Sequence, residues 1–220
     1  MGVDGRLFAL QRESFPDLET PAWLSPEHPR ESFAHYAERL ASSCRRGNEA
    51  HRPVVVGGLS MGGMLALEMA KHLNAPVVAL IGSGDHPCAA SRFLMLGERV
   101  GRFIPDAVFA IGKSLAKAFV GRGGVPPERR RLLQDMLGDM DVGFLKWAGR
   151  AVVAWGGVLP GDIPNCEIRH IHGTRDWVLP ISRLRTPPTQ IVEGGAHVLS
   201  MSHPEEVDRF LRSAMTRAME

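Results

Sequence analysis

A short apolar run that ends in glycines and leads directly into a helix limits what this chain can fold into. Residues 53–58 read PVVVGG, a β-branched run bounded by Pro53 and Gly57 that is typical of a strand buried on both faces of a parallel sheet. Good helix formers follow over 61–73, and a second buried strand is predicted over 77–81. This order predicts a βαβ unit, and therefore an α/β fold with a mostly parallel sheet flanked by helices.

The rest of the chain supplies further elements of the same kind. Helices are predicted over 32–46 and 204–219, and short strands over 167–171 and 189–192. Residues 1–30 are expected to be irregular, since prolines interrupt any long helix there. These prolines are Pro16, Pro21, Pro26 and Pro29.

One long stretch does not fit a compact alternation of strands and helices. More than eighty residues separate the strand predicted over 77–81 from the one over 167–171, far more than a crossover needs. We expect a helical cap insertion at 87–155 over a core formed by 1–86 and 156–220. Its large apolar side chains are expected to form mainly the insertion's own core, with some lining the cleft beneath. Its amphipathic patterns cover 93–103, 107–119, 127–137 and 142–155.

Composition excludes several classes of protein. Hydrophobic residues make up 44% and charged residues 23% of the chain, which is ordinary for a folded domain and too apolar for a disordered one. The net charge of +2 lacks the basic bias of a dedicated nucleic-acid binder. No signal peptide or membrane span is predicted. Three widely spaced cysteines without a CxxC pair predict reduced thiols and a cytoplasmic location.

The turn between the first predicted strand and its helix carries the pattern G-x-S-x-G. Gly58, Ser60 and Gly62 form this pattern within GGLSMGG, in the strand–turn–helix context of a nucleophile elbow. A nucleophilic serine needs a tight turn that exposes its hydroxyl, and side chains two residues before and after it are expected to collide with their neighbours. The N–H of Met61 and the helix N-terminus favour a developing oxyanion. The alternative is a glycine-rich turn in which Ser60 caps the helix.

A serine hydroxyl needs a base, and the base needs an orienting acid. His197 lies in the glycine-rich loop EGGAH after the last predicted strand, and Asp176 lies in HGTRDWVLP after the strand over 167–171. Both loops are expected at the carboxyl edge of the sheet. A surface-loop histidine and a turn-forming aspartate are the plainer interpretations. The order Ser60, Asp176, His197 is that of one class of serine hydrolases and differs from chymotrypsin and subtilisin.

These segments resemble the α/β-hydrolase family, in particular its small carboxylesterases and thioesterases. The similarity rests on GGLSMGG with its helix, on IHGTRDWVLP, and on GGAHVLSMSHPEEVDRFL, in which a Gly-Gly-His loop precedes a helix that opens with Pro-Glu. It covers residues 53–86 and 166–220, and the family's variable helical cap falls between them. A serine at the elbow, in place of an aspartate, argues against the dehalogenase and epoxide-hydrolase branches.

The resemblance implies a role for each matching residue. Ser60 would be the nucleophile, Asp176 the orienting acid and His197 the general base, and the Met61 N–H would be one oxyanion donor. The N-terminus departs from the family pattern. Residues 2–8 resemble the continuation of the family's oxyanion loop, but the strand that normally precedes this loop is missing.

Two interpretations of this N-terminus stay open. The recorded start lies downstream of the true one, or the chain is a minimal hydrolase, N-terminally shortened, whose second oxyanion donor is the N–H of Gly2 or Val3. A missing strand leaves a sheet edge open, so some tendency to form a homodimer or to aggregate is expected.

Other polar residues have plainer interpretations. His170 and His172 alternate along a predicted strand and point to one face, which would suit a metal pair, but no third ligand is evident nearby. Asp85 follows the second strand and is the reserve candidate for the orienting acid. The charged run over 128–131 is expected to be a solvated helix face.

We therefore expect a serine hydrolase that acts on a carboxylic ester or thioester of modest size, with no cofactor, metal or nucleic-acid partner. The apolar cap favours an apolar acyl or alcohol group. Two alternatives remain: a hydrolase-like protein that binds a small molecule and hydrolyses it poorly, and an acyltransferase. Amide, lactone and C–C bond cleavage use the same triad and stay open.

Overall fold

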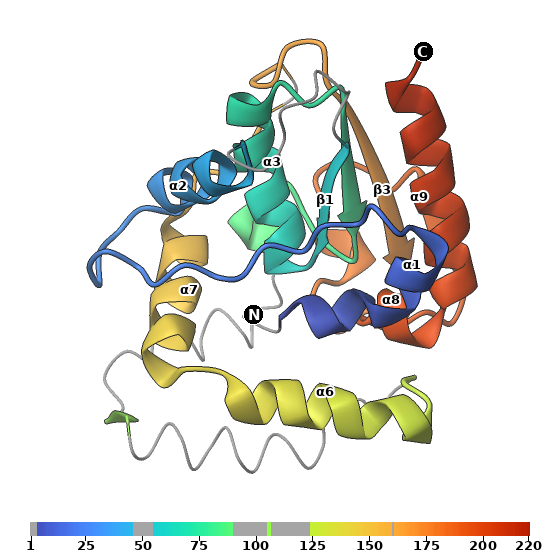
Figure 1. Ribbon diagram of the computed structural model, residues 1–220, viewed down its shortest axis with the longest axis horizontal. Coiled ribbons are helices and arrows are strands. Elements are labelled where there is room, and N and C mark those ends of the chain that lie inside the picture. The colour runs from blue at the N-terminus through green and yellow to red at the C-terminus, as the bar shows by residue number, and fades with distance from the viewer. Residues whose placement is uncertain (1–3, 46–54, 90–104, 107–123, 160) are drawn as a thin grey trace.

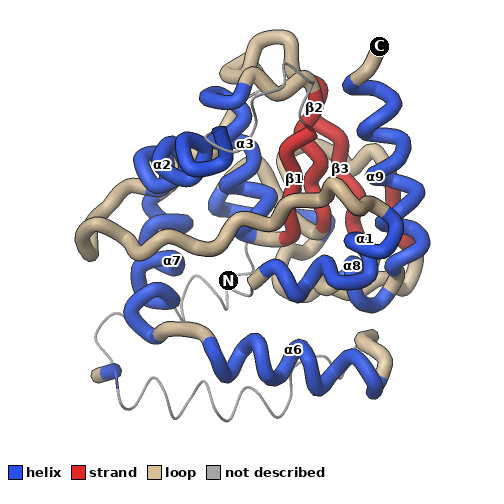
Figure 2. The backbone as a smooth tube through the Cα atoms, viewed as in Figure 1, coloured by secondary structure: helices blue, strands red, loops and turns tan. Residues whose placement is uncertain are grey.

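The computed structural model describes residues 4–45, 55–89, 105–106, 124–159 and 161–220 (Figure 1). Within these residues one sheet of parallel strands lies between two layers of helices (Figure 2). The fold class expected from the sequence, a parallel sheet flanked by helices, is confirmed.

The sheet order follows the order of the strands along the chain. The strands are β1 (Val55–Leu59), β2 (Val77–Ile81), β3 (Glu167–Gly173) and β4 (Gln190–Val192), hydrogen-bonded in the order β1-β2-β3-β4. Every pair is parallel. All carboxyl ends therefore meet at one edge of the sheet, where loops can bring residues from distant parts of the chain together.

Side chains of β2 alternate between two hydrophobic clusters. Val78 and Leu80 face one side, which is covered by α2 (Phe33–Arg45), α3 (Met61–Leu73) and α7 (Val142–Ala154). The remaining β2 side chains face the other side, which is covered mainly by α9 (Pro204–Ala218). Both faces of β2 are buried, which explains why its sequence is a continuous apolar run.

Residues 5–14 are helical, so the expectation of an irregular segment over residues 1–30 is wrong for this part. A 3-10 helix η1 (Gly5–Phe8) leads into α1 (Ala9–Ser14). Asp4 caps η1, because its carboxylate accepts the Arg6 N–H at 2.9 Å. The prolines that break helices begin only at Pro16, so they limit the following segment and not this one.

Two helices predicted within residues 87–155 are confirmed, as α6 (Pro127–Asp139) and α7. The patterns over 93–103 and 107–119 lie outside the described residues. Helix α6 lies on the side of the carboxyl edge of the sheet (Figure 1), where Arg129 donates to the Met201 carbonyl at 2.7 Å. Met201 belongs to α8 (Leu199–Ser202), a short helix that the sequence did not predict.

The aromatic residues of α7 do not form a separate core, which corrects the expectation for this part of the insertion. Trp147 packs on Tyr36 of α2 with ring centroids 4.4 Å apart, and Trp155 packs on Phe33 at 5.3 Å. Phe144 joins the same cluster. These rings face the sheet's own helical layer, so α7 contributes to the main core. The domain boundaries expected at 87 and 155 stay a prediction.

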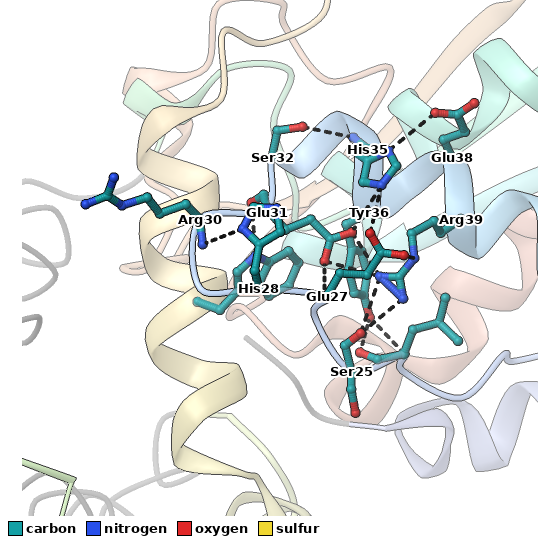
Figure 3. Close-up of polar contacts among 12 residues, drawn as sticks. Ser25, Glu27, His28, Arg30, Glu31, Ser32, His35, Tyr36, Glu38 and Arg39 are labelled. Carbon is teal, nitrogen blue, oxygen red and sulfur yellow. Dashed lines mark hydrogen bonds and ion pairs between the residues drawn. The ribbon is translucent and has the colours of Figure 1, made fainter.

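A buried glutamate fixes the irregular segment between α1 and α2. Glu31 accepts from Arg39 Nη1 at 2.9 Å and from the Glu27 N–H at 2.7 Å (Figure 3). Its backbone carbonyl accepts the Trp147 Nε1–H at 3.0 Å. One residue thus connects this segment to both α2 and α7.

Among the described helices, none is long and apolar enough to cross a membrane.

The Arg39→Met substitution is expected to lower the free energy of unfolding by about 3 kcal/mol, because it leaves the Glu31 carboxylate buried without its cation. Urea unfolding at pH 7 measures the loss. The control is Glu38→Gln, which removes an exposed carboxylate on the same helix and should change stability by less than about 0.5 kcal/mol. Equal effects of the two substitutions would contradict the role given to the buried pair.

Candidate active site

Ser60 occupies a strained turn between β1 and α3. Its φ of 56° is positive, a conformation shared among the described non-glycine residues only with Asn74 and Asn165. The turn is held by its backbone: the Ser60 N–H donates to the Ile81 carbonyl at 3.1 Å, and the Ser60 carbonyl accepts from Ser83 Oγ at 2.7 Å. Such strain costs on the order of 1–3 kcal/mol and persists where the surroundings impose it. This is the geometry of a nucleophile elbow.

Two glycines near Ser60 leave no room for a side chain, but they are not the two that the G-x-S-x-G pattern predicts. A Cβ on Gly58 would lie 2.4 Å from the Gly62 carbonyl carbon. A Cβ on Gly63 would lie 2.5 Å from Ser83 Oγ. A Cβ on Gly62 would meet nothing within 4 Å, so the expected collision of a side chain at 62 is wrong. The helix directs that position into open space, and Gly62 approaches Gly58 through its backbone alone.

The steric difference between neighbouring glycines of α3 can be measured. Gly63→Ala is expected to lower the free energy of unfolding by about 2 kcal/mol, because the new methyl group overlaps Ser83. Gly62→Ala is expected to be neutral or stabilising by up to about 1 kcal/mol, since alanine favours a helix and the space is open. Urea unfolding compares the two. A loss for Gly62→Ala as large as that for Gly63→Ala would disprove this steric interpretation.

Asp176 and His197 form a hydrogen-bonded pair. His197 Nδ1 lies 2.8 Å from Asp176 Oδ2, and the aspartate side chain is fully buried. The other oxygen, Oδ1, accepts the N–H groups of Val178 and Leu179, both at 2.9 Å. An ionised carboxylate only accepts, so His197 donates from Nδ1 and keeps the lone pair of Nε2 for a proton. That is the tautomer a general base needs.

Backbone contacts bring the loops of these two residues together. The β3 end approaches the histidine loop so closely that a Cβ on Gly173 would lie 2.2 Å from the Gly195 carbonyl oxygen. That same oxygen accepts the Arg175 N–H at 2.9 Å. A Cβ on Gly82, just after β2, would lie 2.9 Å from the His197 carbonyl and 3.5 Å from Asp176 Oδ2. Asp176 and His197 therefore meet beside the end of β2.

Ser60 is also held beside the end of β2. Its N–H donates to the carbonyl of Ile81, and a Cβ on the next residue, Gly82, would lie close to both His197 and Asp176. In the described part of the chain His197 Nε2 makes no hydrogen bond, and none joins it to Ser60 Oγ. Catalytic hydrogen bonds are often long in proteins without a bound substrate. The structure thus gathers Ser60, Asp176 and His197 at one edge of the sheet.

The remaining candidate residues are placed as follows. Asp85 accepts from Thr186 Oγ1 at 2.8 Å, so the acid beside His197 is Asp176 and not this reserve candidate. The Met61 N–H lies in the first turn of α3, where an amide has no partner within the helix. The second expected oxyanion donor, at Gly2 or Val3, lies outside the described residues.

A second buried pair, His170 and His172, lies behind the acid loop. His172 Nδ1 is 2.9 Å from His170 Nε2, and His172 Nε2 is 2.8 Å from the Leu179 carbonyl oxygen. Both ring nitrogens of His172 are therefore engaged within the protein, which argues against a metal pair. Burial, aided by the neighbouring His172, lowers the pKa of His170 to about 3. Burial also lowers the pKa of His172.

One other grouping has suitable metal ligands in the described residues. Glu27, Glu31 and His35 place a ligand atom each within 4.8 Å of one another. However, Arg39 lies among them, 3.1 Å from Glu27 and 2.9 Å from Glu31 (Figure 3). A guanidinium already supplies the positive charge there, so this grouping is an ion-pair cluster.

The neutral His170–His172 pair predicts a pH-dependent stability. Unfolded histidines titrate near pH 6.5, whereas the folded pair has lowered pKa values. Above that pH both states leave the histidines neutral, so the pair does not lower the free energy of unfolding. Below it the unfolded chain binds protons that the folded chain excludes. The free energy of unfolding therefore falls by up to about 1.4 kcal/mol per pH unit for each proton, until the pH reaches the pKa values of the folded state. Urea unfolding from pH 7 to pH 4 should show this slope, and His170→Gln should make it shallower. An unchanged slope would contradict the assignment.

Comparison with known proteins agrees with this architecture. Residues 3–210 match the alpha/beta hydrolase family, and the chain belongs to that family. No curated protein matches the sequence.

Solved structures share the fold at low sequence identity. An esterase from Thermogutta terrifontis aligns with a TM-score of 0.71 and 17% identity, over 98% of this chain and 86% of its own. An N-acyl homoserine lactonase in complex with N-butanoyl homoserine aligns with a TM-score of 0.71 and 15% identity, over 100% of this chain and 87% of its own. A bromoperoxidase from Bacillus anthracis aligns with a TM-score of 0.69 and 13% identity, over 97% of this chain and 88% of its own. At these identities the similarity establishes the fold.

Proposed function

We propose that this protein is a serine hydrolase that cleaves a carboxylic ester or thioester of modest size. The observation that carries the proposal is the pair formed by the buried Asp176 and the partly exposed His197, which lies at the same sheet edge as the strained turn of Ser60. A base with a free lone pair, an acid that fixes its tautomer and a serine hydroxyl on a rigid turn are the parts that acyl transfer requires.

The reaction proceeds in two halves. His197 Nε2 takes the proton of Ser60 Oγ as this oxygen attacks the acyl carbonyl, while Asp176 stays ionised and stabilises the imidazolium. The Met61 N–H and, as the second proposed donor, the N–H of Gly2 or Val3 stabilise the oxyanion. The imidazolium then gives its proton to the departing alcohol or thiol, which leaves an acyl-enzyme. Water attacks the acyl-enzyme in the same way, releases the acid and restores Ser60.

The structural neighbours support this chemical class. Among them are an esterase and a lactonase bound to N-butanoyl homoserine. A lactone is a cyclic ester, so both names refer to the attack of a nucleophile on an ester carbonyl. Their low identity leaves the acyl group of this protein's substrate to be measured.

We also propose that the protein works in the cytoplasm on a small-molecule substrate. Cys44 and Cys166 are free thiols, and burial raises the pKa of both. Protonated, partly buried thiols are poor nucleophiles, so neither of these two cysteines competes with Ser60 as the proposed nucleophile. Homodimer formation through an open sheet edge stays a prediction.

Hydrolysis of p-nitrophenyl acetate, butyrate and octanoate tests the proposal. Wild type should turn over at least one of these esters, and Ser60→Ala should reduce kcat by at least about 10³-fold because it removes the nucleophile. Ser42→Ala, which removes a hydroxyl on α2 that donates to the Glu38 carbonyl, is the matched control and should keep full activity. A fluorophosphonate should label Ser60 in wild type and fail to label Ser60→Ala.

The outcomes separate the alternatives. No turnover together with no labelling of Ser60 contradicts the hydrolase and favours a small-molecule-binding protein. Faster acyl transfer to an added alcohol than to water favours an acyltransferase. A rate that is equal in wild type and Ser60→Ala excludes Ser60 as the nucleophile.

A further inference from the structure

A chain of side chains and backbone groups leads from the middle of β3 to the acid of the active site. It begins at His170, passes through His172 to the Leu179 carbonyl, and ends at Asp176, whose Oδ1 accepts the Leu179 N–H. Both histidines are buried, and the His172 ring has no exposed surface. Nothing in the proposed reaction uses these two rings, although they lie directly behind Asp176.

The partners of each ring define its tautomer. The Leu179 carbonyl can only accept, so His172 donates to it from Nε2. The lowered pKa keeps His172 neutral, so its Nδ1 is an acceptor, and His170 must donate to it from Nε2. His170 thereby fixes the Nε2–H tautomer of His172, as Asp176 fixes the Nδ1–H tautomer of His197.

The contact with Leu179 controls the position of Asp176. The turn from 176 to 179 is closed by Oδ1, which accepts the N–H groups of Val178 and Leu179. The far side of the same turn is fixed by His172, which binds the Leu179 carbonyl. Leu179 is buried, so without His172 this carbonyl would lack a partner away from water and the turn would have to move. A displaced turn displaces Asp176 Oδ2 from His197.

The surroundings place few charges near these rings. The groups that act on His172 are Asp176, with an oxygen 3.5 Å from Nε2, and His197 beyond it. On its other side His170 lines a cavity of about 260 Å³ with apolar neighbours such as Leu80. The cavity's one carboxylate, Asp85, is engaged by Thr186.

We infer that His172, held in its Nε2–H tautomer by His170, is a positioning residue for the Asp176–His197 pair. This inference rests on the proposed serine hydrolase function. It also accounts for the neutrality of both rings. A proton on His172 would place a second cation beside Asp176 and compete with the His197 imidazolium for the same carboxylate.

Two substitutions at position 172 test the inference. His172→Leu removes the donor to Leu179, whereas His172→Gln keeps an N–H at about the place of Nε2. In His172→Leu we expect kcat to fall about 10- to 100-fold, as small misplacements of catalytic groups do, with KM changed less than about twofold. The acid limb of the kcat/KM profile should move to lower pH, because a displaced Asp176 stabilises the His197 imidazolium less. His172→Gln should restore most of both properties.

A control separates positioning from general destabilisation. Ile171→Val trims a buried residue of the same strand that belongs to the opposite cluster. It should lower the melting temperature and leave the pH profile unchanged. NMR titration of labelled histidines gives a readout that does not need turnover: the pH midpoint of the His197 ring should fall in His172→Leu and return in His172→Gln.

The results discriminate between the two proposals. An inactive wild type that fluorophosphonate does not label contradicts the hydrolase, and the NMR titration still tests the link between His172 and His197. A His197 midpoint that is unchanged or raised in His172→Leu overturns the positioning role. The positioning role is also overturned if His172→Gln does not restore the His197 midpoint although its melting temperature is near that of Ile171→Val.

Discussion

Close approach of backbone to backbone at the carboxyl edge of the sheet is the constraint on which the candidate active site depends. Gly58 lies against Gly62 at the nucleophile turn, and Gly173 lies against Gly195 between the acid and histidine loops. A methyl group at Gly58 or Gly173 would overlap atoms of the facing segment. Because these segments are in contact, they hold Ser60, Asp176 and His197 at the same edge of the sheet.

Sequence patterns predicted the parts of the fold that local chemistry determines. Helix α3 and strand β2 have the predicted bounds, because a buried β-branched run and a run of helix formers need no distant partner to be recognised. The positions of Ser60, Asp176 and His197 at one sheet edge could be predicted for a similar reason, whereas their catalytic roles stay a prediction. Each follows a predicted strand, and parallel strands bring their carboxyl ends together.

Features that depend on distant partners were not predictable. The aromatic face of α7 was assigned to a separate cap core, but its partners Phe33 and Tyr36 lie more than a hundred residues earlier in the chain. His170 and His172 were weighed as a metal pair, and only the position of the Leu179 carbonyl indicates a different role. The open space beside Gly62 likewise depends on the direction of a helix, which the pattern G-x-S-x-G does not encode.

Gly82 has no side chain, yet its surroundings connect it with all three candidate catalytic residues. Ser60 is hydrogen-bonded to Ile81, the residue before Gly82, and a Cβ on Gly82 would approach His197 and Asp176. The position carries no reactive group, so a search for chemistry overlooks it. Its positive φ and its crowded surroundings nevertheless leave it almost no substitutes. A redesign of this site is therefore restricted most by the backbone conformation directly after β2. New side chains have to be chosen to fit that conformation.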